Sequence, residues 1–302
     1  MSSPTLLITG ACGFTGRHLV TTAKEKGYRC IALAQYEGSA VEGAASTIVA
    51  DLLNPLALQR AIKQAAPTYI VHLAAISFVA HGDTADMYRV NQLGTVNLLE
   101  AIQKCAPEIK KVLIASSANI YGNTSDLPIT EATSPAPVNH YGMSKMTMEL
   151  ATQLYPNLPI ILTRPFNYTG LGQNPNFLIP KIVSAFQRHE KLIELGNLDV
   201  SRDFSDVRDV VSAYIKLLES ESSSQIFNIC SGQPTALQSV VSMLNDLAGY
   251  EIEVRTNPAF VRNDEIKTLY GSPQRLIKTI GQHPKLSLKD TLAWMFDGTF
   301  MS

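Results

Sequence analysis

The chain has 302 residues, which is enough for one large hydrophobic core or two coupled domains. Apolar residues make up 45% and charged residues 17%, as in a folded soluble protein, and a net charge of −1 gives no reason to expect nucleic acid or a membrane as partner. No run of about 18 apolar residues predicts a membrane span, and no basic N-terminal segment predicts a signal peptide. The four cysteines form no Cys-x-x-Cys pair, so we expect reduced thiols in a cytoplasmic protein.

The first half of the chain alternates short apolar runs with amphipathic stretches. Strands are predicted at residues 6–9, 30–34, 47–50, 70–73, 111–116 and 160–164, and helices at residues 15–26, 55–65, 84–106 and 141–155. Strands made of near-continuous Val, Ile and Leu, separated by helices, indicate a parallel sheet that is covered on both faces. We therefore expect an α/β fold with a doubly wound, parallel-sheet Rossmann domain.

The pattern changes after residue 164. A loop rich in turn-forming residues is followed by predicted helices at residues 179–188 and 206–219, a strand at 226–232 and two helical stretches near the C-terminus. We expect residues 1–165 to form the dinucleotide-binding domain, with residues 205–230 returning to it. Residues 166–302 would then form mainly a smaller, mixed α/β substrate domain.

Three glycines punctuate the first strand–helix junction, in the stretch LLITGACGFTGRHL at residues 6–19. Gly10 permits a tight turn, Gly13 lets the backbone approach a pyrophosphate, and Gly16 lets the new helix pack close to the sheet. The free N–H groups at the start of that helix attract phosphate. Because the glycines follow a strand and open a helix, they predict a dinucleotide-binding loop rather than a plain turn.

A second pattern lies in two segments further along the chain. The stretch YGMSK places Tyr141 and Lys145 four residues apart, on one face of a helix, and an apolar run upstream ends in Ser116 and Ser117. Reduction of a ketone produces an alkoxide that needs a proton, and a nearby lysine cation tunes a tyrosine, whose free pKa is about 10, for that task. These residues predict carbonyl chemistry; a surface helix pair is the alternative.

Together these motifs resemble the extended branch of the short-chain dehydrogenase/reductases, the NAD-dependent epimerase/dehydratase family, over nearly the whole chain. The resemblance implies a catalytic triad of Ser117, Tyr141 and Lys145. The segments ADLLNP (residues 50–55) and HLAA (residues 72–75) match family segments beside the cofactor. The implied cofactor-binding residues are Gly10, Gly13, Phe14, Thr15, Gly16, Arg17, Gln35, Asp51, Leu52, Leu73, Ala74, Ala75, Tyr141 and Lys145.

The end of the second strand bears on the choice of cofactor. Members of the family that prefer NAD carry an acidic residue there, which binds the ribose hydroxyls. This sequence has Ala34 and Gln35 instead, so nothing at these two positions repels a 2′-phosphate. NADP(H) is favoured and NAD(H) remains the alternative, with Arg17 either near the phosphate or simply solvated.

The substrate segments resemble a subgroup that acts on GDP-sugars, the GDP-mannose 4,6-dehydratases and the GDP-4-keto-6-deoxymannose reductases. By that resemblance, the expected substrate contacts are Asn167, Lys181, Arg202, Arg262 and Glu265. Asp203, Asp206 and Asp209 are spaced for a capped helix start, with Asp206 as the N-cap, rather than for a metal, and no metal site is predicted.

The residues that follow Ser117 also distinguish the dehydratases from the reductases. The dehydratases carry an acidic residue two positions after the triad hydroxyl, whereas Ala118 and Asn119 follow Ser117 here. The resemblance therefore implies an NAD(P)H-dependent 4-ketoreductase, converting GDP-4-keto-6-deoxy-D-mannose to GDP-D-rhamnose. A 4-epimerase, a reductase of CDP-, UDP- or dTDP-sugars and a non-catalytic NADP-sensing protein are the alternatives. The family also implies a homodimer through the helices near residues 84–106 and 141–155.

Overall fold

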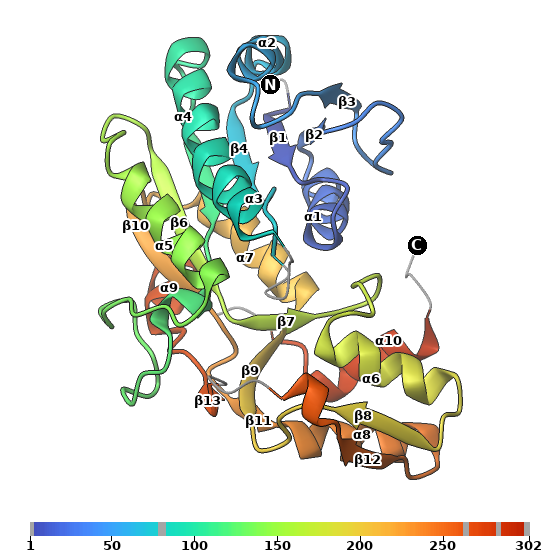
Figure 1. The fold of residues 1–302 in the computed structure, drawn as a ribbon. Coiled ribbons are helices and arrows are strands. Elements are labelled where there is room, and N and C mark those ends of the chain that lie inside the picture. Colours follow the sequence, from blue (N-terminus) through green and yellow to red (C-terminus); the bar gives the residue numbers. More distant parts are fainter. Residues whose placement is uncertain (1–2, 78–82, 262–265, 282–284, 299–302) are drawn as a thin grey trace.

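The computed structural model of the protein describes residues 3–77, 83–261, 266–281 and 285–298, and a seven-stranded sheet forms its centre (Figure 1). The strand order is β10-β6-β5-β4-β1-β2-β3, and every pair in it is parallel. This confirms the predicted doubly wound α/β sheet. Its strands are β1 Thr5–Thr9, β2 Arg29–Ala34, β3 Ser46–Val49, β4 Tyr69–His72, β5 Lys111–Ala115, β6 Ile160–Pro165 and β10 Gln225–Ile229.

Helices cover both faces of this sheet because apolar side chains occupy both sides of each strand. In β1, Leu6 and Ile8 join the core beneath α1 (Phe14–Glu25) and α7 (Val207–Glu219). Leu7 points to the opposite core, beneath α2, α4 and α5. The helices on that second face are α2 Pro55–Ala65, α4 Gly94–Cys105 and α5 His140–Thr152, while α9, Gln274–Ile280, packs near β10.

The strand order reverses beside β1. From β1 the chain builds outward through β2 and β3, then returns to the other side of β1 to add β4, β5 and β6. In open sheets of this kind, ligands bind outside the carboxyl ends of the strands at the point of reversal. We therefore expect a ligand to bind between the loop that follows β1 and the loop that follows β4.

The predicted single helix over residues 84–106 is wrong in one respect. The structure divides it into α3 (Thr84–Tyr88), a π-helical turn (Arg89–Leu93) and α4. A π-helical turn contains one extra residue and interrupts the helical period. Here the turn contains Asn91, whose buried side chain bonds to the backbone of Ile76, as described below.

A smaller set of strands and helices lies beyond the carboxyl edge of the large sheet (Figure 1). Strand β9 (Ser201–Asp206) pairs with β7 (Asn167–Thr169), β11 (Pro234–Ala236) and β13 (Thr268–Leu269). A second, two-stranded sheet pairs β8 (Leu192–Leu195) with β12 (Glu253–Thr256). Three helices pack on these strands around a separate apolar core, namely α6 Leu178–Gln187, α8 Leu237–Ala248 and α10 Leu288–Asp297.

The chain passes between the two sheets more than once. Helix α7 and strand β10 lie with the large sheet, although β7, β8 and β9 precede them in sequence. Among the described helices, none is both long enough and apolar enough to span a bilayer.

Candidate active site

The glycine loop closes tightly around the end of β1. Gly10 has a φ of +69°, and a Cβ there would lie 2.7 Å from the backbone nitrogen of Ala74. A Cβ on Gly16 would overlap the carbonyl oxygen of Gly10 and the backbone of Ala11. Both positions therefore need glycine for packing alone.

Gly13 plays a different part from the other two glycines. It is exposed and is the N-cap residue of α1, with an ordinary φ of −75° and no side chain to cap the helix. The first N–H groups of a helix are left for an external acceptor when no side chain caps them, and the helix dipole favours an anion there. The loop thus fits the pyrophosphate of a dinucleotide.

A buried hydrogen-bond network supports the neighbouring loop after β4. The hydroxyl of Thr9 accepts the backbone N–H groups of residues 73 and 74 at 3.2 and 3.1 Å, and lies 2.6 Å from His72 Nδ1. His72 Nε2 lies 2.9 Å from the hydroxyl of Thr95, which donates to the carbonyl of Asn91. His72 Nε2 therefore donates and Nδ1 accepts, and burial lowers the pKa of His72 to about 3, which keeps it neutral.

Asn91 connects this loop to the predicted catalytic helix and was missed by the sequence analysis. Its side chain accepts the N–H of Ile76 at 2.8 Å and donates to the carbonyl of the same residue at 3.0 Å. It also donates to the hydroxyl of Ser144 at 3.0 Å, and Ser144 donates to the carbonyl of Tyr141 at 2.8 Å. The one available signal was a polar residue at a buried position of an apolar stretch, which does not reveal a π-helical turn.

The three predicted catalytic residues come together at the carboxyl end of β5. Tyr141 lies in the first turn of α5, where Asn139 caps the helix by accepting the N–H of Gly142 at 2.8 Å. The Ser117 side chain lies close enough to Tyr141 to oppose the rise in the pKa of the phenol. Lys145 donates from Nζ to the carbonyl of Ala115 at 2.8 Å. The carbonyl of residue 115 therefore holds Lys145 at the carboxyl end of β5, one helical turn after Tyr141.

Burial acts in opposite directions on the two titratable groups. It raises the pKa of Tyr141 well above 10, while the Ser117 side chain opposes the rise. It lowers the pKa of Lys145 to about 8, while the charge of Glu149 opposes the fall. Glu149 is held by a buried ion pair with Arg164, at 2.6 and 3.0 Å. Tyr141 is therefore protonated near neutral pH and suited to donate a proton.

The two serines at this strand end have different surroundings. Ser117 accepts hydrogen bonds from the backbone and side chain of Asn119, both at 3.2 Å, and begins a short 3-10 helix (Ala118–Tyr121). Ser116 is buried, and within the described chain its hydroxyl has no hydrogen-bond partner. The contact with Tyr141 is thus made by Ser117.

The residues predicted for the adenosine side lie at the same edge of the sheet. Gln35 is exposed directly after β2, and Arg17 is exposed on α1. Asp51 follows β3, where its carboxylate accepts the N–H of Leu53 at 2.9 Å. Leu52 is buried, and its carbonyl accepts a hydrogen bond from Asn97. The carboxyl ends of neighbouring strands bring these side chains to one rim.

Of the five predicted substrate residues, three lie within the described chain and two lie outside it. Asn167 is exposed on β7, which pairs with β9, the strand that carries Arg202. Arg202 is largely buried and donates to the carbonyls of residues 201 and 267. Lys181 lies on α6, where it donates to the carbonyl of residue 194 and lies 4.4 Å from the ring centroid of Phe260. Arg262 and Glu265 lie outside the described residues.

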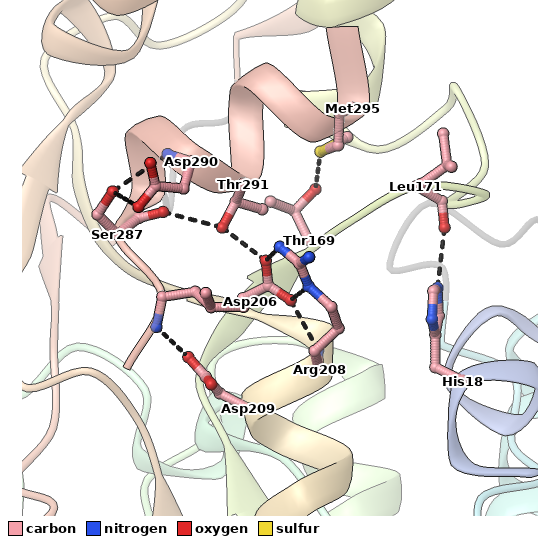
Figure 2. A network of polar contacts seen from close by, with 11 residues as sticks. His18, Thr169, Leu171, Asp206, Arg208, Asp209, Ser287, Asp290, Thr291 and Met295 are labelled. Atoms are coloured by element: carbon pink, nitrogen blue, oxygen red, sulfur yellow. Dashed lines mark hydrogen bonds and ion pairs between the residues drawn. The ribbon is translucent and has the colours of Figure 1, made fainter. Parts of the chain in front are cut away.

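The three aspartates near β9 have separate partners. Asp206 caps α7 by accepting the N–H of Arg208, as predicted, and it also bonds to the side chains of Arg208 and Thr291 (Figure 2). Asp209 accepts the N–H of residue 286. Asp203 was predicted near a helix start but lies inside β9, where it accepts the N–H groups of residues 231 and 232. In the part of the chain that the structure describes, no cluster of His, Cys, Asp or Glu is arranged for a metal.

Comparison with known proteins agrees with this geometry. The model of the NAD dependent epimerase/dehydratase family matches residues 6–230. GDP-6-deoxy-D-talose 4-dehydrogenase of Aggregatibacter actinomycetemcomitans is 38% identical, over 91% of this chain and 91% of that protein. GDP-6-deoxy-D-mannose reductase of Pseudomonas aeruginosa is 33% identical, over 95% of this chain and 94% of that protein.

A solved structure gives the same result. RMD from Pseudomonas aeruginosa, complexed with NADPH, has a TM-score of 0.84 and 30% identity, over 98% of this chain and 97% of that chain. The resemblance seen in the sequence motifs is thereby confirmed. The chain belongs to the NAD-dependent epimerase/dehydratase family, the extended branch of the short-chain dehydrogenase/reductases, and is an oxidoreductase of that type.

Proposed function

We propose that this protein is an NAD(P)H-dependent reductase of the 4-keto group of a GDP-activated 6-deoxyhexose. The observation that carries the proposal is the placing of Ser117, Tyr141 and Lys145 beside a glycine loop that fits a dinucleotide. Residues 118 and 119 carry no carboxylate that would support dehydration. The names of the two relatives, both acting on GDP-6-deoxysugars, support the substrate class.

The chemistry assigned to the chain is a proton transfer with electrostatic support. A dinucleotide held at the loop of Gly10, Gly13 and Gly16 would supply the hydride for the carbonyl carbon. Tyr141, which burial keeps protonated, donates its phenol proton to the carbonyl oxygen. Ser117 donates a hydrogen bond to the same oxygen and orients it. Lys145 places a positive charge beside the phenolate that remains.

We propose the same division into a cofactor region and a substrate region that the sequence predicts. We assign residues 1–165 and 205–230 to cofactor binding, and the rest of residues 166–302 mainly to the sugar nucleotide. Arg202 is suited to the diphosphate, since a guanidinium offers a planar pair of donors. Asn167 would contact the sugar next to the diphosphate. Lys181, Arg262 and Glu265 remain the proposed contacts to the rest of the nucleotide.

Two products are compatible with one ketone substrate. Talose and mannose differ only at C4, so reduction of the same 4-keto-6-deoxy sugar from opposite faces gives GDP-6-deoxy-D-talose or GDP-D-rhamnose. The sequence motifs led us to expect GDP-D-rhamnose. The 38% identity to a GDP-6-deoxy-D-talose 4-dehydrogenase makes the talose product the second candidate.

We assign NADP(H) as the preferred cofactor. Neither Ala34, at the end of β2, nor the exposed Gln35 that follows carries a negative charge against a 2′-phosphate. The similarity to a structure complexed with NADPH supports the assignment. NAD(H) is the alternative.

The test supplies GDP-4-keto-6-deoxy-D-mannose and NADPH and follows the loss of NADPH absorbance, with identification of the product. Tyr141→Phe should lower kcat at least about a hundredfold, because it removes the proton donor. Tyr250→Phe serves as the matched control. The Tyr250 hydroxyl donates to the carbonyls of residues 186 and 190, so its removal should leave the activity unchanged.

Other outcomes would contradict the proposal. A protein that oxidises no NADPH with GDP-, CDP-, UDP- or dTDP-ketosugars is not such a reductase. A protein purified with bound NAD⁺ that interconverts sugar epimers without added NADPH is a 4-epimerase. Binding of NADPH with no turnover on the same panel would indicate a sensor.

We also propose that the protein is a homodimer that associates through α4 and α5. Leu150, in the last turn of α5, is 52% exposed, and Leu154, two residues beyond α5, is 78% exposed. Leu93, just before α4, is 49% exposed. Apolar side chains that recur at helical spacing on an exposed face suggest contact with another helix.

A further inference from the structure

Two hydrogen bonds join helix α1, which follows the glycine loop, to the segment that carries Asn167, the proposed sugar contact. The hydroxyls of Thr15 and Tyr168 are 2.8 Å apart. One turn further along α1, His18 donates from Nε2 to the carbonyl of Leu171 at 2.9 Å (Figure 2). Because both pairs are offset by three residues, the two segments run alongside each other. We refer to these two bonds as the α1–β7 contact.

Aromatic rings enclose the same contact. The rings of Phe14 and Tyr168 are stacked, with centroids 6.1 Å apart and an interplanar angle of 15°. His18 packs edge-on against Phe14 at 5.3 Å and against Trp294 of α10 at 5.7 Å. Burial lowers the pKa of His18, so the neutral ring donates to Leu171. These part-buried bonds hold α1 and β7 in one arrangement.

The two ends of the α1–β7 contact serve different ligands under the proposed function. Thr15 lies in the first turn of α1, where the N–H groups face a pyrophosphate. Tyr168 is flanked in β7 by the exposed Asn167, whose side chain points to the other side of the strand. A ligand that orders the start of α1 thereby also orders the strand that carries Asn167.

We propose that His18 and Tyr168 are positioning residues that couple dinucleotide binding at α1 to the ordering of residues 167–171 for the sugar nucleotide. The identity of the sugar nucleotide rests on the proposed function, whereas the coupling itself does not. By linkage, the dinucleotide then raises the affinity for GDP by the same factor as GDP raises the affinity for the dinucleotide.

The first test measures the Kd for GDP by calorimetry, without NADPH and with saturating NADPH. In the unaltered protein we expect NADPH to tighten GDP binding by about fivefold or more, the lower end of common coupling factors. Tyr168→Phe keeps the stacked ring and removes the hydroxyl, and His18→Leu removes the donor. In each, the factor should fall to about twofold or less.

Two further variants separate coupling from a general structural effect. In His18→Gln, the amide nitrogen stands near the position of Nε2 and should restore the coupling factor. Tyr250→Phe removes a phenol hydroxyl that bonds to residues 186 and 190, remote from α1, and should leave the factor unchanged. Equal coupling factors in the unaltered protein and Tyr168→Phe would overturn the proposal, as would a loss of coupling in Tyr250→Phe.

A second measurement needs the cofactor alone. NADPH should slow amide hydrogen exchange in a peptide covering residues 166–177 of the unaltered protein, and not in Tyr168→Phe or His18→Leu. If NADPH binds but leaves this exchange unchanged in the unaltered protein, the coupling is refuted. A protein that binds no GDP but shows the exchange effect contradicts the proposed substrate and retains the coupling.

Discussion

At the scale of single residues, one buried environment shifts the pKa values of Tyr141, the proposed proton donor, and of Lys145 in opposite directions. Desolvation disfavours the charged form of each group, so it holds the proton on Tyr141 and loosens the proton on Lys145. The carboxylate of Glu149, one turn further along α5, restores part of the affinity of Lys145 for its proton. The site thus has a ready proton donor and a cation whose charge depends on pH.

This balance predicts how the rate of reduction depends on pH. Lys145, with a pKa of about 8, is charged below that pH and loses its charge above it, while Tyr141 stays protonated throughout. We therefore expect kcat/KM to fall as the pH rises through about 8. The measurement is a pH–rate profile from pH 6 to about 10. In Lys145→Arg the guanidinium stays charged, so the fall should move to higher pH, although the longer side chain lowers the rate overall.

At the scale of elements, the glycine loop combines residues needed for folding with one that remains open to a ligand. Gly10 and Gly16 are confined by backbone atoms on either side of the turn. Gly13 has an ordinary φ, and a Cβ there would lie 3.2 Å from one atom, the carbonyl oxygen of Gly10. Alanine substitutions at Gly13 and at Gly16, three residues apart, should consequently have different effects.

The prediction for the loop contrasts these two substitutions. Gly13→Ala places a methyl group where the pyrophosphate approaches, so the Kd for NADPH should rise about tenfold or more, with a smaller fall in melting temperature than in Gly16→Ala. Gly16→Ala forces a methyl group into backbone atoms and should destabilise the fold by about 1–3 kcal/mol. Calorimetry and thermal denaturation distinguish the two effects. Equal loss of stability in both variants would argue against a ligand-facing role for Gly13.

At the scale of the whole molecule, the active site depends on two units that meet along several contacts. The α1–β7 contact joins the glycine loop to the smaller unit. Asp206 at the start of α7 bonds to Thr291 of α10 (Figure 2). The guanidinium of Arg208 lies 3.9 Å from the ring centroid of Trp294. The sugar-binding candidates are thereby held against the cofactor-binding sheet by buried polar and aromatic contacts.

The proposed dimer gives a prediction at this scale. Replacing Leu150 and Leu154 together by Glu puts two charges into the proposed interface, so a dimer should become a monomer. Sedimentation velocity measures the change. Leu198→Glu is the control, since Leu198 is 37% exposed between β8 and β9 in the smaller unit, and it should leave the dimer intact. A monomeric unaltered protein would rule the interface out.

The sequence by itself determined the parallel α/β sheet, the glycine loop after its first strand and the grouping of the proposed acid–base residues. These features follow from apolar periodicity and from spacings of a few residues, which local backbone geometry converts directly into neighbouring side chains. Residues at the ends of parallel strands, such as Gly10 and Ser117, then share one edge once the fold class is known.

Only the tertiary structure decided the π-helical turn at Asn91, the position of Asp203 inside β9 and the α1–β7 contact. Asn91 turns inward because the backbone of residue 76 and the side chain of Ser144 offer it partners. Thr15 and Tyr168 are separated by 153 positions in the chain. No local pattern encodes such pairs, because they form only when segments far apart in the sequence pack against each other.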